Sequence, residues 1–320
     1  MNSKKNSLLI LGASSFISKP LIEAIQKKFS LKILCQSRKN LKENFSNYKK
    51  KIIFSNIDYS KDNYKIDYIH ECKYVINLIN SSNLNSNEIK NVRRFLKYVL
   101  KISNAELIHI STASVYGSCQ DKIICEDSLC YPKNKYQIIK RLDEIYLQKL
   151  ATDIGTKCFI LRPTEIIGYK SQNASKFIKN YISSSFFKRY LIKSFNGLRT
   201  MHFVSCDYLV STIIKIIERK TSPGIYLVSQ DSDKANDFIE FCKIIEEIKP
   251  SRFNYFINKF YKFPLYWLFK IIYRIFRENQ IPPDSKFISK KPIINLNDFY
   301  PLRKDLNKHI NYILDNQKEI

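Results

Sequence analysis

The sequence predicts an α/β protein, with a doubly wound parallel sheet followed by a smaller, mainly helical C-terminal domain. Two observations predict this class. Short apolar runs alternate with amphipathic segments up to about residue 168, and beyond that point the alternation stops. Such alternation is typical of right-handed β-α-β units, whose parallel strands are covered by helices on both faces. A chain of 320 residues that is 44% hydrophobic is also long and apolar enough for two domains.

The predicted strands of the sheet are short, continuous apolar runs. They cover residues 7–11, 31–35, 52–57, 74–79, 107–111 and 158–161. Between them, apolar residues recur at helical spacing, which predicts helices over 17–29, 92–102 and 136–152. After residue 168 we expect helices over 175–187, 210–220 and 236–248 and one strand over 224–228. The predicted domains are residues 1–168, rejoined by about 205–230, and a second domain of 169–204 and 231–320.

The chain is strongly basic. It has 54 Lys and Arg against 29 Asp and Glu, a formal net charge of +25. No segment is a pure Lys/Arg tract and no nucleic-acid-binding motif occurs, so a nucleic-acid partner is not expected. The charge is mainly a bias of the whole composition, although a basic protein also attracts phosphorylated ligands and anionic membrane surfaces.

Cysteine and histidine spacing gives no sign of a metal site. None of the eight cysteines forms a C-x-x-C pair, and the four histidines lie far apart. The apolar run after the basic start is too short for a signal peptide, and no stretch approaches 18 uncharged apolar residues. We therefore expect a soluble, reduced, cytoplasmic protein without a bound metal.

The segment from Phe263 to Arg277 is apolar and aromatic, with Lys270, Arg274 and Arg277 among its apolar residues. Two interpretations stay open. It packs into the core of the second domain, or it forms a basic amphipathic helix that lies on a membrane.

The first predicted strand runs directly into a glycine and then a helix. Gly12 can supply the tight turn that a dinucleotide pyrophosphate needs before a helix N-terminus. The usual fingerprint has two further glycines, and here Ser15 and Ser18 stand in their places. The loop alone is therefore a weak signal for cofactor binding.

A second motif follows the fifth predicted strand, where residues 110–117 read ISTASVYG. Tyr136 comes 24 residues after Thr112, and Lys140 comes four residues after Tyr136. Residues i and i+4 share a helix face, so the Tyr and Lys side chains project together. A neighbouring ammonium favours the phenolate, and the Thr112 hydroxyl can hydrogen-bond a reacting alcohol oxygen.

With these motifs in order, the chain resembles the extended short-chain dehydrogenase/reductase family, the NAD(P)-dependent epimerases and dehydratases of nucleotide sugars. The resemblance covers about two-thirds of the sequence. It rests on residues 12–18 (GASSFIS), 56–59 (NIDY), 75–80 (VINLIN), 110–117 (ISTASVYG), 136–140 (YQIIK), 161–168 (LRPTEIIG) and 201–207 (MHFVSCD).

The resemblance implies a Rossmann domain and gives the residues roles. Tyr136 would be the general acid/base, Lys140 would lower its pKa and hold the nicotinamide ribose, and Thr112 would position the sugar hydroxyl. The implied cofactor contacts are Gly12, Ser14, Ser15, Phe16, Ile17, Arg38, Asp58, Tyr59, Leu78, Ile79, Asn80, Tyr136, Lys140 and Pro163. The second domain would hold a nucleoside diphosphate sugar, with Ser114 and Arg199 as implied substrate contacts.

Three departures from the family pattern refine these expectations. After the second strand, Arg38 suits a 2′-phosphate and no acidic residue is present to accept ribose hydroxyls, which favours NADP over NAD. Ala113 and Ser114 replace the acidic pair of the 4,6-dehydratases and argue against that reaction. Met201 stands where many members have a diphosphate-binding Arg, with Arg199 two residues away.

Three functions stay open. The leading hypothesis is a nucleotide-sugar epimerase that transfers a hydride transiently. The alternatives are an NADPH-dependent 4-keto-sugar reductase and a non-catalytic NAD(P)-binding scaffold or sensor on the same fold. The sequence leaves open whether the protein is a homodimer.

Overall fold

The computed structural model describes residues 6–37, 52–57, 64–82, 84–168, 171–219, 221–250, 281–294 and 301–316. The chain forms two compact units. The first comprises Met1–Val115, Asn134–Arg162 and Val210–Tyr226, and the second comprises Tyr116–Lys133, Pro163–Leu209 and Leu227–Ile320. Residues 116–133 and 163–168 thus belong to the second unit. The sequence pattern instead predicts that the first domain extends to residue 168.

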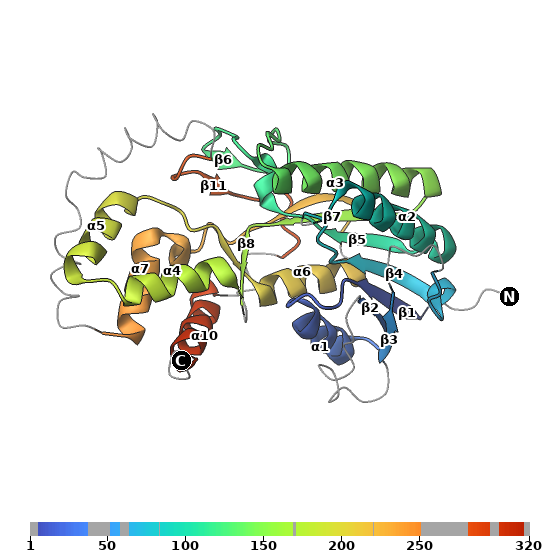
Figure 1. Cartoon of the computed structure of the whole chain (residues 1–320), viewed down its shortest axis with the longest axis horizontal. Coiled ribbons are helices and arrows are strands. Elements are labelled where there is room, and N and C mark those ends of the chain that lie inside the picture. The colour runs from blue at the N-terminus through green and yellow to red at the C-terminus, as the bar shows by residue number, and fades with distance from the viewer. Residues whose placement is uncertain are drawn as a thin grey trace. The chain divides into compact units, whose positions relative to one another are not determined.

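A seven-stranded sheet in the order β10-β7-β5-β4-β1-β2-β3 is built from the described residues (Figure 1). Its strands are β1 (Ser7–Leu11), β2 (Lys32–Ser37), β3 (Ile52–Asn56), β4 (Cys72–Asn77), β5 (Glu106–Ile110), β7 (Cys158–Pro163) and β10 (Gly224–Val228). All pairings from β3 through to β7 are parallel. The chain moves outward from β1 to β3 and then returns to pair β4 with the other side of β1. This reversal is the topological switch point at which doubly wound sheets bind ligands.

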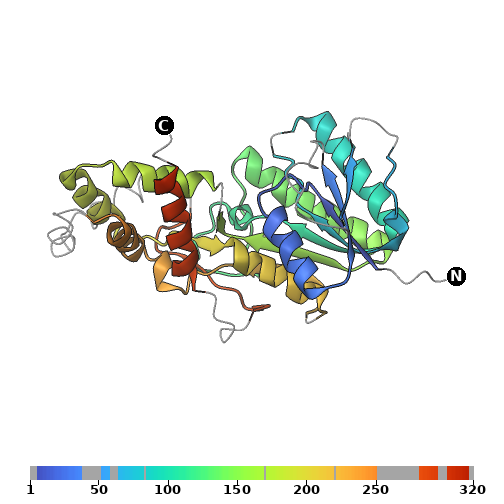
Figure 2. The same cartoon turned by 90° about the horizontal axis from the view of Figure 1, so that it is seen from below.

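Helices cover both faces of this sheet. Helices α2 (Ser86–Ser103) and α3 (Lys135–Ile154) lie on one face, and α1 (Ser18–Lys28) and α6 (Cys206–Ile217) lie on the other, which is the near face in Figure 2. The tyrosine Tyr74 on β4 donates a hydrogen bond from its hydroxyl to the Ile217 carbonyl at the end of α6, 3.0 Å away. The predicted doubly wound α/β class is confirmed.

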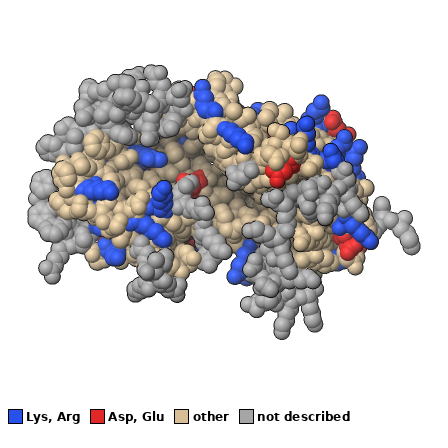
Figure 3. All heavy atoms as spheres, viewed as in Figure 1, with Lys and Arg blue, Asp and Glu red and all other residues tan. Residues whose placement is uncertain are grey.

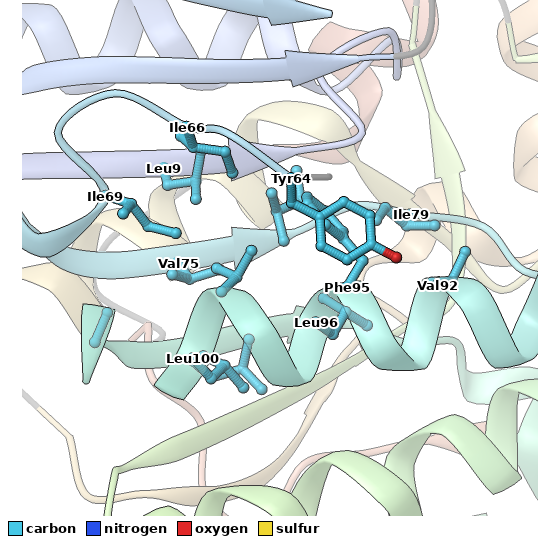
Figure 4. Packing of buried hydrophobic residues seen from close by; sticks show 14 of the residues in the cluster. Leu9, Tyr64, Ile66, Ile69, Val75, Ile79, Val92, Phe95, Leu96 and Leu100 are labelled. Carbon is cyan, nitrogen blue, oxygen red and sulfur yellow. The ribbon is translucent and has the colours of Figure 1, made fainter. Parts of the chain in front are cut away.

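The core between the sheet and α2 shows why these residues form these elements. Leu9 and Leu11 of β1 face this core, as the two-residue period of a strand requires, and α2 adds Phe95 and Val99 at helical spacing. Tyr64 packs edge-on against Phe95 with ring centroids 5.0 Å apart (Figure 4). Helix α2 begins at a capping box in which the Asn85 side chain accepts from the Glu88 amide, so a local signal fixes its start.

The second unit has its own core of helices. They are α4 (Gln172–Ile182), α5 (Phe186–Asn196), α7 (Phe238–Ile248) and α10 (Leu302–Asp315). Two small parallel sheets accompany them, β6 (Ile123–Ile124) with β11 (Lys286–Phe287) and β8 (Glu165–Ile167) with β9 (Phe203–Ser205). Helix α10 and both small sheets lack a clear sequence pattern and were not predicted.

The predicted helix over 175–187 is wrong, because α4 ends at Ile182 and α5 begins at Phe186. Serines cause the break. The Ser183 and Ser184 hydroxyls donate to the Asn180 carbonyl, at 3.2 and 2.6 Å, and Ser185 caps α5 by accepting from the Lys188 amide. Serine competes with helical hydrogen bonding in this way and favours helix ends.

A buried ion pair lies inside the helical core of the second unit. The Lys193 ammonium on α5 is 2.8 Å from the Glu246 carboxylate on α7, with exposed fractions of 0% and 4%. Tyr181 on α4 donates its hydroxyl proton to the same carboxylate at 2.6 Å. One carboxylate thus joins three helices.

On the face drawn in Figure 3, the Lys and Arg side chains of the described residues lie in separate groups rather than in one continuous stripe. No described helix is both long and apolar enough to cross a membrane. Within the described ranges, no three His, Cys, Asp or Glu side chains are grouped so that they could hold a metal ion.

Candidate active site

The turn between β1 and α1 forms a cradle that only glycine fits. Gly12 has a φ of +74°, and a Cβ there would lie 3.0 Å from the backbone of both Leu78 and Ile79. The β1 turn is therefore pressed against the end of β4, at the switch point of the sheet. The N-terminus of α1, which follows this turn, carries amide groups without intrahelical partners, and such a terminus suits a phosphate. These features fit a dinucleotide.

The turn keeps its shape although two glycines of the usual fingerprint are missing. Ser15 donates its amide to the Gly12 carbonyl at 3.0 Å, which closes the turn. Ser18 is fully buried, so serine is small enough for the close packing that glycine usually allows there. Gln36, also fully buried, accepts from the Gly12 amide and donates to the Ile57 carbonyl, both at 3.3 Å.

The other predicted cofactor contacts divide into three groups. Ser14, Phe16 and Ile17 lie in the same turn as Gly12. Leu78, Ile79 and Asn80 directly follow β4, whose end contacts this turn. Arg38, Asp58 and Tyr59 lie outside the described residues. Pro163 is the last residue of β7 and belongs to the second unit.

Thr112 and Tyr136, which the sequence placed together, do meet. Thr112 follows β5, and Tyr136 lies in the first turn of α3. Burial raises the pKa of Tyr136 above its ordinary value, and the nearby Thr112 hydroxyl opposes that shift. The Thr112 hydroxyl also accepts from the Ser114 amide at 3.2 Å and lies 3.1 Å from the Ser114 hydroxyl.

The position of Tyr136 follows from the local sequence. Asn134 caps α3, its side chain accepting from the Gln137 amide at 2.9 Å while the Gln137 side chain accepts from the Asn134 amide at 3.3 Å. Tyr136 is 37% exposed in this first turn, so the phenol is accessible while its hydroxyl contacts Thr112.

Lys140 lies one turn further along α3 and is buried. Its ammonium donates to the Ile110 carbonyl at the end of β5, 3.4 Å away. Burial lowers the pKa of Lys140, and the nearby Asp143 and Glu144 carboxylates oppose that shift. The lowering of the Tyr136 pKa by Lys140 that the resemblance implies stays a prediction.

Sequence reasoning missed a buried polar layer beneath these residues. Glu144, fully buried on α3, receives hydrogen bonds from Ser111 at 2.6 Å and from Arg141 at 2.8 Å. Arg162 on β7 donates two more, at 2.9 and 2.7 Å. Burial raises the pKa of Glu144, but Arg162, Ser111 and Arg141 outweigh it and hold the pKa below its ordinary value. The available signal was an acidic residue four positions after Lys140, on the same helix face.

A buried histidine completes this layer. Asn77 accepts the Ile79 amide with its side-chain oxygen at 3.1 Å, so its NH₂ group faces His109 Nδ1, 3.0 Å away. This arrangement places the proton of the neutral ring on Nε2. Burial and the Lys140 charge lower the pKa of His109 to about 3.

The two predicted substrate contacts lie in different units. Ser114 is in the first unit beside Thr112, and Arg199 is an exposed residue of the second unit, after α5. Met201 is half-buried next to the helical core of the second unit. Both substrate contacts stay predictions.

A turn at the switch point that fits a dinucleotide, a Tyr near a Thr hydroxyl and a buried Lys on the same helix as the Tyr are the elements of an oxidoreductase-type site on a doubly wound sheet. Residues 8–229 match the model of the NAD dependent epimerase/dehydratase family, so the chain belongs to that family. Members of this family depend on NAD, in keeping with the turn after β1 that fits a dinucleotide.

Among curated proteins, the chain is similar to a dTDP-4-dehydro-6-deoxyglucose reductase of Escherichia coli. The two are 29% identical over 182 residues. The match covers 51% of this chain and 56% of the relative, so it spans little more than half of that protein.

Solved structures share the fold. A UDP-glucuronic acid 4-epimerase of Bacillus cereus, in complex with UDP-glucuronic acid and NAD, is 16% identical with a TM-score of 0.66. A UDP-glucose 4-epimerase of Thermotoga maritima, with UDP-glucose, is 14% identical with a TM-score of 0.63. Each match covers 97% of this chain and 99% of the other.

Proposed function

We propose that the protein is a nucleotide-sugar epimerase that works by transient hydride transfer, with Tyr136 as acid/base. The observation that carries the proposal is that Tyr136 lies near the Thr112 hydroxyl and one helical turn before the buried Lys140. The substrate class is supported by the nucleotide sugars in structures of the same fold.

The dinucleotide, when bound, supplies hydride chemistry. The residues of this chain do the rest. Thr112 orients the sugar hydroxyl toward Tyr136, and Tyr136 accepts or returns the hydroxyl proton. Lys140, held at the Ile110 carbonyl, contributes positive charge one helical turn after Tyr136. Gly12 and the first turn of α1 hold the pyrophosphate.

Tyr136→Phe tests the proposal. The ring and its packing are kept, so folding and dinucleotide affinity should be close to wild type. Turnover of UDP- and dTDP-sugars should fall by at least ~10²-fold, the scale for loss of a general acid/base. Turnover within a few-fold of wild type would remove Tyr136 from the mechanism.

A second candidate function is an NADPH-dependent 4-keto-sugar reductase, which the similarity to a dTDP-4-dehydro-6-deoxyglucose reductase favours. The two functions differ in stoichiometry. A reductase consumes one reduced nicotinamide per product, so absorbance at the nicotinamide band falls steadily. An epimerase interconverts UDP-sugars with no net change in that absorbance.

Arg38 is the proposed determinant of NADP preference, although it lies outside the described residues. Arg38→Ala should weaken NADP(H) binding by ~1.5–3 kcal/mol, the range for a hydrogen bond to a charged group, and leave NAD(H) binding unchanged. Titration of both cofactors against both proteins measures this. Equal small losses would show that Arg38 does not contact the phosphate.

The protein is also proposed to be a homodimer that pairs through α3. Ile138, Leu142 and Ile145 are 41%, 48% and 48% exposed and recur at the spacing of one helix face. Leu142→Glu should shift sedimentation toward a monomer, and a wild-type protein that already sediments as a monomer overturns the proposal. Residues 263–277 lie outside the described residues, so their contact with a membrane stays a prediction. The cytoplasmic location also stays a prediction.

A further inference from the structure

The carboxylate of Glu144 is the meeting point of three separate chain segments. It lies on α3, receives the Ser111 hydroxyl from the end of β5, and receives the Arg162 guanidinium from β7. Glu144 is fully buried and Arg162 is 2% exposed. All of these residues belong to the first unit.

Each segment carries a residue of the proposed site. Glu144 lies one turn after Lys140 and two turns after Tyr136 on α3. Ser111 directly precedes Thr112 in the chain. The carboxylate therefore connects the helix that bears the proposed acid/base to the strand end that bears its hydroxyl partner.

The bonds to Glu144 are of a kind that fixes geometry. A guanidinium fork on a carboxylate permits one planar arrangement, and Arg162 uses both Nε and Nη2 in this way. The Ser111 hydroxyl then takes up the Oε1 atom at 2.6 Å. Because Arg162 holds the Glu144 carboxylate in one orientation, the hydrogen bond to that carboxylate also fixes the Ser111 side chain. The backbone of Thr112, the next residue, is restrained as a result.

Resting on the proposed function, we propose that Glu144 is a positioning residue, which through Ser111 holds Thr112 in place beside Tyr136. It contacts neither substrate nor cofactor in this role. The effect on catalysis comes through the geometry of the Thr112–Tyr136 pair.

Asp143 separates this role from a simple effect of charge. It is next to Glu144 in sequence, its carboxylate also acts on Lys140, and it is largely buried. Its carboxylate, however, pairs with the Arg93 guanidinium, 3.1 Å away. Arg93 lies on α2, a helix that carries no residue of the proposed site. Asp143→Asn therefore removes a charge near Lys140 and leaves the Ser111 bond in place.

The experiment compares Ser111→Ala, Glu144→Gln, their double variant and Asp143→Asn. Ser111→Ala removes the connecting hydroxyl and leaves every charge, so it keeps the test available even if Glu144→Gln fails to fold. We expect Ser111→Ala to lower kcat about tenfold with KM nearly unchanged, since misplaced reacting groups can cost up to ~10²-fold. The double variant should be no slower than Glu144→Gln, because both changes break one connection.

Hydrogen exchange of the protein without added ligand gives a readout independent of turnover. Amides of residues 112–116 should exchange faster in Ser111→Ala than in wild type, and at the wild-type rate in Asp143→Asn. Wild-type exchange and kcat in Ser111→Ala would overturn the proposal, and so would an equal loss of kcat in Asp143→Asn. If Tyr136→Phe keeps its turnover, the proposed chemistry fails, while the exchange result still decides whether Glu144 orders the Thr112 segment.

Discussion

Each unit of the molecule contains a buried carboxylate with a buried cation, and the two clusters connect different kinds of segment. In the first unit, Glu144 and Arg162 join a helix to the ends of two strands, next to Thr112. In the second unit, Glu246 and Lys193 join three helices of a core that contains no predicted site residue. A buried ion pair by itself thus does not mark function. The segments that an ion pair connects are the better guide to a possible role in function.

The largest effect should come from breaking the cluster of the second unit. Lys193→Met leaves the Glu246 carboxylate buried without its cation, and removal of one partner of a buried pair typically costs ~3–5 kcal/mol. Urea unfolding measures the loss. The double change Lys193→Met with Glu246→Leu should recover most of it, because no buried charge is left unpaired. A loss below ~1 kcal/mol in the single variant would contradict the structural role.

The next effect concerns the first unit, where the site is expected to respond in turnover rather than stability. Thr112→Ala removes the hydroxyl near Tyr136 that is proposed to orient the sugar hydroxyl, and should slow the reaction by ~10²-fold, as loss of a group that acts on the transferred proton does. Ser114 contacts Thr112 alone among the proposed catalytic residues, so Ser114→Ala should cost much less. If Ser114→Ala is the slower enzyme, the assignment of the strand-end motif is wrong.

The last comparison is between a buried histidine in each unit and is made through acid stability. The pKa of His109 is about 3 in the folded chain and near 6.5 when unfolded, so below pH 6.5 the unfolded state takes up the proton first. Stability should be unaffected above pH 6.5 and fall by up to ~1.4 kcal/mol per pH unit between pH 6.5 and about 3.

His109→Gln should flatten that slope in unfolding curves measured from pH 7 to pH 4. His309 of the second unit is the matched comparison. Burial lowers its pKa as well, and burial is the one cause of that shift, whereas the Lys140 charge adds to it at His109, so His309→Gln should flatten the slope less. A slope that is the same in wild type and His109→Gln would show that His109 is not the group that titrates.

The sheet could be predicted from sequence because its signals are local. Each buried strand is a short apolar run, and the pairing of Tyr136 with Thr112 follows from one helix face and one strand end. The Glu144 cluster could not be predicted in this way. Its partners Ser111 and Arg162 are 33 and 18 residues away along the chain, and only folding brings them to one carboxylate. The β6–β11 sheet joins two-residue strands more than 160 residues apart, which leaves no periodic pattern to detect.

Gly117, which follows the short 3-10 helix Ala113–Tyr116 after β5, has a practical consequence for anyone who builds variants of this protein. Only six of 320 residues are glycine. Gly117 has a φ of +60°, and a Cβ there would lie 1.8 Å from the Tyr131 carbonyl oxygen. A library that diversifies this loop to alter substrate range should hold position 117 constant, as it should position 12. Serine could replace two glycines of the nucleotide fingerprint because space was available there, and at residue 117 that space is missing.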